Sequence, residues 1–289
     1  MKKLIPLLMC VMFSMNTYAD SSTISRIKES GIVKIGVRTN ADPFSSYQNG
    51  QANGYMVDLC NIVIEDLQKN IKKKINIQYV PVNPNNRFEL IQSGEIDMEC
   101  GTTTVSNQRR EKVDFSYNTF ITSTNFVTLS KNKIDLPRDF YEQLIASNKK
   151  IALMKGTSHE EILKKTTRGR SFNVVYVNSI EEGLNKVATG ETFAFVQDKA
   201  LIQKGITNLQ LNKNLFSFSQ EPLSIEPYSI MMKKGDDEMV SFVNSSLRNA
   251  YSSGQARKIM TQWLQPKQID INFLTSDNFK SPSTENSVN

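Results

Sequence analysis

The sequence predicts an α/β protein built from two lobes. Runs of valine and isoleucine that are typical of strands alternate with amphipathic helical segments, and this alternation occurs twice along the chain. An Asp-Leu-Pro signal at 135–137 separates the two occurrences and opens a new unit. With 289 residues, 39% of them hydrophobic, the chain can bury one large core or two moderate ones, and the repeated pattern favours two.

The first region begins with an apolar, β-branched run that predicts a strand, and a loop with Pro43 follows it. The next segment places its apolar residues at a spacing of three and four, which predicts a helix with one buried face. The predicted elements are a strand at 31–37, a loop at 42–53, a helix at 56–70, a strand at 75–80, a helix that begins at Arg87, a short strand at 94–99 and an extended run at 119–129.

The second region repeats the alternation and then returns to helices. Strands are predicted at 150–154, 173–177, 192–197 and 229–233, and helices at 160–165, 180–188, 237–251 and 255–264. From Thr275 onward the sequence is polar, and we expect a disordered tail over 275–289.

Residues 1–19 predict a cleavable secretory signal. Two lysines precede an apolar run, and small residues lead up to Asp20, where the mature chain would begin. The apolar run is shorter than the roughly 20 residues that span a bilayer, although a retained N-terminal anchor is the alternative. We therefore expect a soluble protein exported to the periplasm.

The charge of the mature chain is mild, 33 − 29 = +4, and its basic residues are scattered among acidic ones. Without a basic stripe interleaved with aromatics, the sequence indicates no nucleic-acid partner, and Lys72–Lys74 is interpreted as a solvated helix end. Cys60 and Cys100 remain after export, either as one disulfide or as two buried thiols.

The segment 87–116 indicates a site for an anion. Ser106 is a suitable N-cap, which places Arg109 in the first turn of a helix, where a positive charge is locally unfavourable. An anion shared between this guanidinium, nearby threonines and free backbone N–H groups would account for the placement. The alternative is a solvated pair of arginines neutralised by Glu111 and Asp114.

Three further polar residues have open interpretations. Asp198 closes a predicted strand, where it reaches a bound cation or else caps the helix that begins near Lys199. His159, the only histidine, is expected to be an exposed residue of a first helical turn. Glu99 is interpreted as a carboxylate that orients an arginine, with a role as a base as the alternative.

The order and spacing of several short motifs carry a family resemblance that extends from about Ile27 to Phe273. The motifs are KIGVR at 34–38, DPF at 42–44, GYMVDL at 54–59, NNRFELIQSGEIDMECGTTT at 85–104, Arg109, DFS at 114–116, KGTS at 155–158, FAFVQD at 193–198 and the helix at 255–264. In these residues the chain resembles the periplasmic solute-binding proteins of ABC-type polar amino-acid importers, solute-binding protein family 3, and most of all the glutamate/aspartate-binding members.

The resemblance implies the type II periplasmic binding protein fold, in which each lobe is a mostly parallel sheet flanked by helices. The first lobe would comprise 20–126 and 235–274, and the second 127–234. Two crossover strands at about 127–131 and 230–234 would join the lobes and act as the hinge.

The resemblance also implies a set of ligand-binding residues. Arg109 and Thr104 would bind the α-carboxylate of an amino acid, while Asp198 from the second lobe and Thr102 would bind its α-ammonium group. Arg38 and Arg87 would meet a side-chain carboxylate and so select glutamate or aspartate. Thr157 and Tyr228 are secondary candidates, and either of them can instead be structural.

A charge count supports the acidic ligand, because three arginines against Asp198 sum to 3 − 1 = +2 and an acidic amino acid brings −1. One departure weakens the match. Glutamate/aspartate members carry a histidine from the second lobe near the side-chain carboxylate, and the matching segment here, Asn178–Glu181, has none.

We expect capture by hinge closure and delivery to the membrane subunits of an ABC permease, by a monomer without cofactor, metal or catalytic residue. No GxxxxGK[ST] sequence is present to hold a nucleotide phosphate. The alternatives are an exported enzyme on the same fold, such as a dehydratase or lyase, and a receptor or adhesin that retains the fold.

Overall fold

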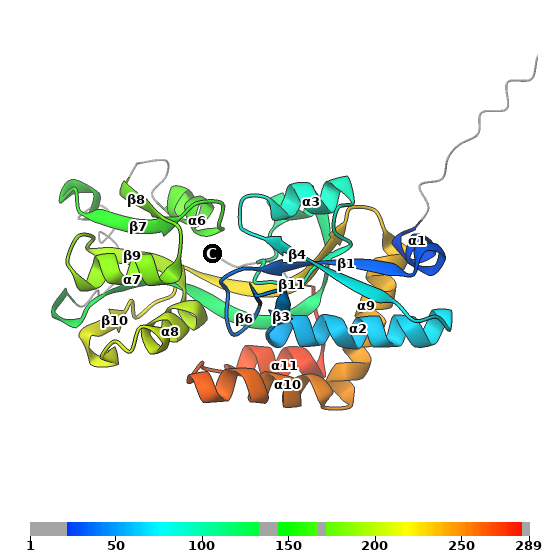
Figure 1. The fold of residues 1–289 in the computed structure, drawn as a ribbon. Coiled ribbons are helices and arrows are strands. Elements are labelled where there is room, and N and C mark those ends of the chain that lie inside the picture. Colours follow the sequence, from blue (N-terminus) through cyan, green and yellow to red (C-terminus); the bar gives the residue numbers. More distant parts are fainter. Residues whose placement is uncertain (1–21, 133–143, 167–171, 285–289) are drawn as a thin grey trace, which may run out of the picture.

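The computed structural model describes residues 22–132, 144–166 and 172–284 (Figure 1). The predicted signal peptide at 1–19 and the Asp-Leu-Pro boundary at 135–137 lie outside these ranges. Within the ranges no helix has both the length and the apolar character needed to cross a membrane.

The described strands form one long sheet, with the order β4-β1-β5-β11-β6-β9-β7-β8 and β10 paired with β6. A separate hairpin, β2 with β3, lies in the predicted loop after β1. The strands are β1 Ile32–Arg38, β2 Ser46–Gln48, β3 Gln51–Asn53, β4 Asn76–Val82, β5 Met98–Glu99, β6 Val113–Leu129, β7 Lys150–Met154, β8 Asn173–Val177, β9 Ala194–Asp198, β10 Phe216–Phe218 and β11 Ser224–Lys233.

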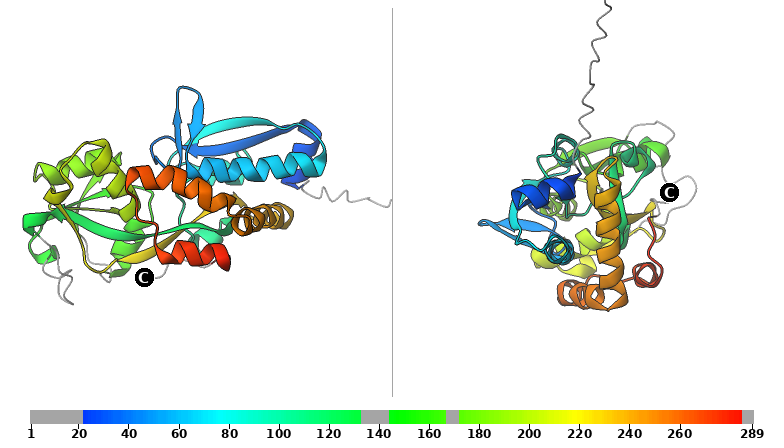
Figure 2. Two further views of the ribbon diagram at one scale, coloured as in Figure 1. Left: turned by 90° about the horizontal axis from the view of Figure 1, so that it is seen from below. Right: turned by 90° about the vertical axis from the view of Figure 1, so that its right-hand side faces the viewer.

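Helices cover this sheet in two groups (Figures 1 and 2). The described helices are α1 Thr23–Ser30, α2 Tyr55–Ile71, α3 Arg87–Ser93, α4 Asn107–Arg110, α6 His159–Thr166, α7 Ile180–Ala188, α8 Lys199–Asn208, α9 Asp237–Ser252, α10 Gln255–Leu264 and α11 Phe273–Lys280, with short 3-10 turns at Ser130–Asn132, Lys213–Leu215 and Gln265–Lys267.

Two long strands connect two parallel half-sheets. On one side β1 pairs in parallel with β4 and β5, and on the other β7 pairs in parallel with β8 and β9. Between them β6 and β11 run antiparallel to each other through both halves, as Figure 1 shows. The predicted α/β class, with mostly parallel sheets joined by two crossing strands, is confirmed. The residue boundaries of the lobes stay a prediction.

The periodicity of the sequence located the main elements because one face of each is buried. The 17-residue helix α2 buries Leu59, Val63 and Leu67 against the sheet, as the helical spacing predicted. Gly54 precedes this helix with φ 133°, and a Cβ there would lie 2.4 Å from the carbonyl oxygen of Phe44. Glycine is therefore required where the hairpin passes under the helix start.

The prediction of a disordered tail from Thr275 is wrong for the part that the structure describes. Residues 273–280 form α11, which packs along β6 (Figure 2). Phe279 stacks on Tyr251 with ring centroids 4.5 Å apart, and the Asn278 amide donates to the backbone of Asn118. The segment is polar overall, but Thr275 and Asn278 hydrogen-bond to β6 and Phe279 packs on α9, so tertiary contacts offset the ordering entropy.

Candidate ligand-binding site

A cavity lies between the two half-sheets, at the carboxyl ends of β1, β5, β7 and β9, where open α/β sheets bind their ligands. It encloses about 410 Å³ of space, part of it continuous with solvent. The lining residues are Arg38, Asn40, Ala41, Arg87, Thr102, Thr104, Arg109, Met154, Thr157, Ser158, His159, Ile180, Gln197, Asp198 and Leu201. Seven of the eight predicted site residues are among them, and Tyr228 lies directly behind Asp198.

Arg38 enters the cavity from the end of β1. Its backbone N–H donates to the Ser45 hydroxyl at 3.0 Å, and its Nη1 donates to the Thr102 hydroxyl at 3.1 Å. The side chain is buried, and burial lowers the pKa of Arg38. The guanidinium donates to a neutral hydroxyl, so its positive charge remains available for an anion.

Arg109 enters from α4, and its side chain is buried rather than solvated. Ser106 caps the helix by accepting from the Arg109 N–H at 3.3 Å, as predicted. Arg109 Nη1 donates to the Thr104 carbonyl at 2.8 Å, which fixes one edge of the guanidinium. The alternative of a surface arginine pair is therefore wrong for Arg109, and Asp114 instead pairs with Lys234 at 2.8 Å.

Arg87 stands at the start of α3 and completes a group of three buried guanidiniums. Burial, followed by the like charges of Arg109 and Arg38, lowers the pKa of Arg87 well below its usual range. Arginine keeps its proton in proteins, so the direction of this shift indicates that the charged group is destabilised there, first by burial and then by its neighbours. Phe88 offers its ring to both Arg87 and Arg109, at 5.0 and 5.6 Å. Across the described residues, none of the three guanidiniums forms a direct ion pair with a carboxylate.

Asp198 faces these arginines from the end of β9. It is the residue before α8, but its side chain makes no capping hydrogen bond to that helix. Instead, Asp198 Oδ2 accepts from the Tyr228 hydroxyl at 2.7 Å, and Oδ1 lies 3.2 Å from His159 Nε2. Burial, and then Asp198 itself, raise the pKa of Tyr228 well above its usual range, so the phenol is a permanent donor. The helix-cap interpretation of Asp198 is excluded.

The expectation that His159 is exposed is wrong. Only 1% of the residue is accessible. Its side chain points into the interior, where it lines the cavity and faces Asp198 at the end of β9. Local sequence gave no sign of this burial, since Glu160 and Glu161 follow it as in an ordinary solvated first turn.

Two contacts hold the ring of His159 in the cavity. Its Nδ1 lies 2.9 Å from the Thr157 hydroxyl, which itself donates to the Met154 carbonyl at 2.7 Å. Its Nε2 lies 3.2 Å from Asp198 Oδ1 on the other side. His159 is therefore a buried polar residue that faces the same aspartate as Tyr228 does.

Two buried glutamates lie beside the site. Glu99 is fully buried on β5, where burial raises its pKa and Arg87 and then Arg38 act to lower it. Glu226 is equally buried on β11 and was missed by the sequence analysis, because Pro227 interrupts the strand pattern and the predicted strand begins only at Ser229. An acidic residue directly after Ile225 and two residues before Tyr228 was the available signal.

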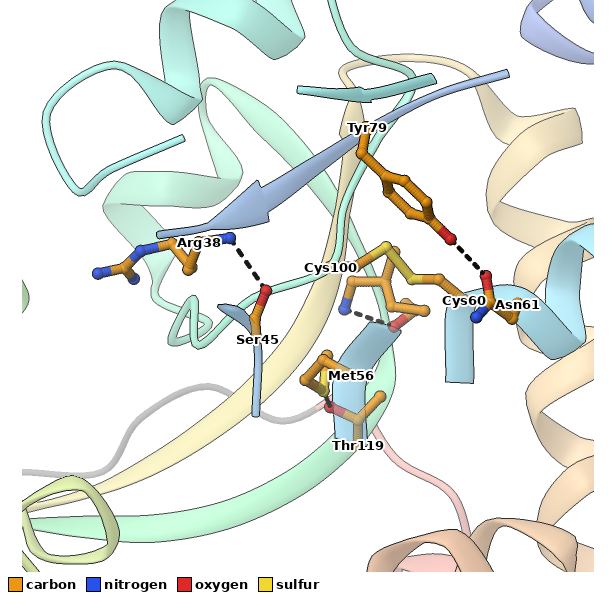
Figure 3. Close-up of a disulfide and its surroundings, with 10 residues drawn as sticks. Arg38, Ser45, Met56, Cys60, Asn61, Tyr79, Cys100 and Thr119 are labelled. Carbon is orange, nitrogen blue, oxygen red and sulfur yellow. Dashed lines mark hydrogen bonds between the residues drawn. A yellow bond between two sulfur atoms is a disulfide. The ribbon is translucent and has the colours of Figure 1, made fainter. Parts of the chain in front are cut away.

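The Cys60–Cys100 disulfide is formed, which resolves the two alternatives left by the sequence (Figure 3). It joins α2 to the residue that follows β5, and Gly101 begins the loop that carries Thr102 and Thr104. A Cβ at Gly101 would lie 2.0 Å from Glu99 Oε1 and 2.8 Å from Arg38 Cγ. The loop is thus anchored at its first residue and packed tightly against the arginine.

No group of histidine, cysteine, aspartate or glutamate residues suited to a metal ion occurs in the part of the chain that the structure describes. The fold and the polar cavity between its two halves define a two-lobed solute-binding protein of type II. The chain belongs to the bacterial extracellular solute-binding proteins, family 3, whose model matches residues 33–266.

Relatives of known name extend over most of the chain. It is 28% identical over 271 residues to the glutamate/aspartate import solute-binding protein of Escherichia coli (strain K12), covering 91% of this chain and 87% of that protein. It is 29% identical over 269 residues to the L-glutamate/L-aspartate-binding protein of Pseudomonas aeruginosa, covering 90% and 87%. The glutamine-binding protein GlnH of Bacillus subtilis is 26% identical, covering 84% and 85%.

Solved structures share the fold. A solute receptor for L-cysteine from Neisseria gonorrhoeae has a TM-score of 0.71 at 22% identity and covers 85% of this chain and 94% of that chain. An ancestral amino acid-binding protein, a precursor of cyclohexadienyl dehydratase, has a TM-score of 0.69 at 24% identity, covering 84% and 100%.

Proposed function

We propose that this protein captures an acidic L-amino acid, glutamate or aspartate, between its two lobes and delivers it to an ABC membrane permease. The observation that carries the proposal is the group of three buried guanidiniums opposite one aspartate. A cluster of cations in a partly dry cavity is unfavourable until an anion joins it. The relatives named for glutamate and aspartate support the same ligand class.

Each end of the ligand has a partner of opposite charge in this proposal. Arg109 presents its free edge to the α-carboxylate as a bidentate donor, and the Thr104 hydroxyl assists it. Asp198 accepts from the α-ammonium group, with Thr102 on the other side. Arg38 and Arg87 take the side-chain carboxylate.

His159 fills the role left open by the missing family histidine. The sequence lacks a histidine at Asn178–Glu181, but the ring of His159 reaches the same cavity from the second half through the start of α6. Thr157 supports the ring and is a positioning residue in this proposal, and Tyr228 does the same for Asp198.

Among the charged side chains that line the cavity, three arginines face Asp198, which gives the same 3 − 1 = +2 that the sequence suggested. An acidic amino acid, with net charge −1, reduces this excess, whereas glutamine leaves it unchanged. Exchange of the side-chain carboxylate for an amide is expected to cost about 2–5 kcal/mol of binding free energy.

Closure of the two halves is the proposed signal to the permease. In the structure the halves touch on both rims of the cavity: Lys204 of α8 forms an ion pair with Asp42 at 3.1 Å, and Gly156 packs against Asn85 and Pro84. Because Arg109 and Asp198 lie on opposite halves, one ligand meets both only when the cleft is shut. Binding therefore favours the closed state.

Calorimetry against L-glutamate, L-aspartate and L-glutamine tests the ligand class. We expect tight binding of at least one acid and binding of glutamine weaker by a factor of 30 or more, from the lower end of the roughly 2–5 kcal/mol above. Equal affinity for all three would reject the acidic ligand.

The rival functions have separate tests. An enzyme on the same fold would release a dehydrated or cleaved product, so mass spectrometry of the recovered ligand must find the amino acid unchanged. A receptor or adhesin would co-purify with a membrane protein other than transporter subunits. In the proposal the protein acts as an exported, periplasmic monomer without cofactor.

A further inference from the structure

Glu226 lies on β11, which connects the two halves, between the points where each half is attached to this strand. On one side of it, the loop of the first half is bonded to β11: the Val105 N–H donates to the Pro227 carbonyl at 2.9 Å and the Ser229 N–H to the Thr103 carbonyl at 3.2 Å. On the other side, Ser224 lies opposite Thr124 of β6, which in turn pairs with Asp198. Glu226 thus lies in the short interval between the attachment points of the two halves.

From this interval the Glu226 carboxylate contacts both halves. Its Oε2 accepts from the Ser158 hydroxyl at 3.0 Å, and Ser158 directly precedes α6 in the second half. Its Oε1 accepts from the Ser224 hydroxyl. The Thr104 hydroxyl of the first half also acts to lower the pKa of Glu226.

The charge of Glu226 faces the ligand-binding groups of both halves. Burial lowers the pKa of Arg109, and the carboxylate of Glu226 is the largest electrostatic effect that opposes this lowering. The pKa of Glu226 itself is raised by burial and then by Asp198, while His159 acts to lower it. A buried carboxylate beside Asp198 is costly, and it is retained here with the hydroxyl donors of Ser158 and Ser224 and with the charge of Arg109 near it.

We propose that Glu226 is a positioning residue that couples closure of the lobes to the alignment of the binding groups, through its hydrogen bond to Ser158. Thr104 and Arg109 move with β11, because the loop at 103–105 is bonded to that strand. Ser158 directly precedes α6 in the second half and separates from β11 when the halves open. The contact between Glu226 and Ser158 is therefore made on closure, and it sets His159 and Thr157 opposite Arg109.

The inference rests on the proposed function, because its readout is the affinity for an amino acid. The variants are Glu226→Gln, which removes the charge and keeps the shape, Ser158→Ala and the double variant. Glu221→Gln is the matched control, since Glu221 lies just before β11 and is exposed. Calorimetry gives the affinity for L-glutamate and L-aspartate, and urea unfolding without ligand gives the intrinsic stability.

We expect each single variant to weaken binding roughly tenfold, the size of one hydrogen bond to a charged group. The double variant should bind no more weakly than the weaker single variant, because both changes break one contact. Glu226→Asp should restore part of the affinity, and Glu221→Gln should stay within about twofold of the unchanged protein, as expected for an exposed site. If Glu226 had only a structural role, its replacement would lower the free energy of unfolding, but the losses of affinity in the single and double variants would not show this coupling.

Unchanged affinity in Glu226→Gln, or effects of the two single changes that multiply in the double variant, would overturn the inference. If Glu226→Gln fails to fold, Ser158→Ala with Glu226→Asp decides the question by the same comparison. If the unchanged protein binds no amino acid, the proposed function itself is rejected, and the inference with it. The two failures are thus distinguishable.

Discussion

Replacement of Arg109 by alanine is the most direct test of the cavity as an amino-acid site. The side chain is buried, and one edge of its guanidinium is already used on the Thr104 carbonyl at 2.8 Å. The other edge retains two parallel N–H donors for a carboxylate. Two charge-assisted hydrogen bonds are worth about 1.5–3 kcal/mol each, so their loss predicts an affinity lower by roughly 10² to 10⁴.

Isothermal calorimetry with the best-binding amino acid measures this loss directly. Arg109→Lys should be intermediate, because lysine keeps the charge but has no planar fork. Arg110→Ala is the matched control: Arg110 is the next residue of α4, lies over the Phe115 ring at 5.6 Å and does not line the cavity. Thermal unfolding of each variant shows whether the fold is retained.

A result that contradicts the reasoning is a folded Arg109→Ala protein whose affinity equals that of the unchanged protein. The carboxylate would then be held elsewhere, and the assignment of the two ends of the ligand would be wrong. An equal loss in Arg109→Ala and Arg110→Ala would point to disruption of α4 rather than to a lost contact.

Three further predictions concern the anchoring of the site and the tail. Gly101→Ala should weaken binding at least tenfold, because its Cβ would approach Glu99 Oε1 to 2.0 Å and displace the neighbouring arginine; calorimetry showing full affinity would contradict this. Serine at both disulfide cysteines should lower the free energy of unfolding in urea by about 4 kcal/mol, as expected for a crosslink across 40 residues, and an unchanged midpoint would refute that estimate. Phe279→Ala should lower the free energy of unfolding by about 3–5 kcal/mol, because its ring is buried and stacked on Tyr251. Phe273→Ala, at a position 71% exposed, should change it by less than about 0.5 kcal/mol, and equal melting temperatures for the two variants would contradict a packed α11.

Patterns that depend on one buried face were predictable from the sequence. The spacing of apolar residues in α2 and the β-branched run of β1 gave these elements to within about a residue at each end. The same holds for the cap at Ser106, because its hydrogen bond to Arg109 is local. Seven of the eight proposed site residues lie in one cavity, because Arg38 and Asp198 end predicted strands and the other five lie in the loops and helix starts that follow the strands.

Features that depend on contacts between distant segments were not predictable. His159 has the local sequence of an exposed helix start, and its buried partner Asp198 is 39 residues away. Glu226 lies beside a proline, and its partner Ser158 is 68 residues distant. The order of α11 likewise comes from Asn118, about 160 residues earlier in the chain. In each case a polar side chain gains a partner that no local pattern records.

The charged side chains that line the cavity bear on the ranking of ligands as a set. Arg38, Arg87 and Arg109 face Asp198, so an acidic amino acid, which brings a net charge of −1, would reduce the excess of positive charge. An amide would leave this excess unchanged, and a basic amino acid would increase it. Because an uncompensated buried charge is unfavourable, the proposed function predicts the ranking acid, amide, base for the affinities measured by calorimetry.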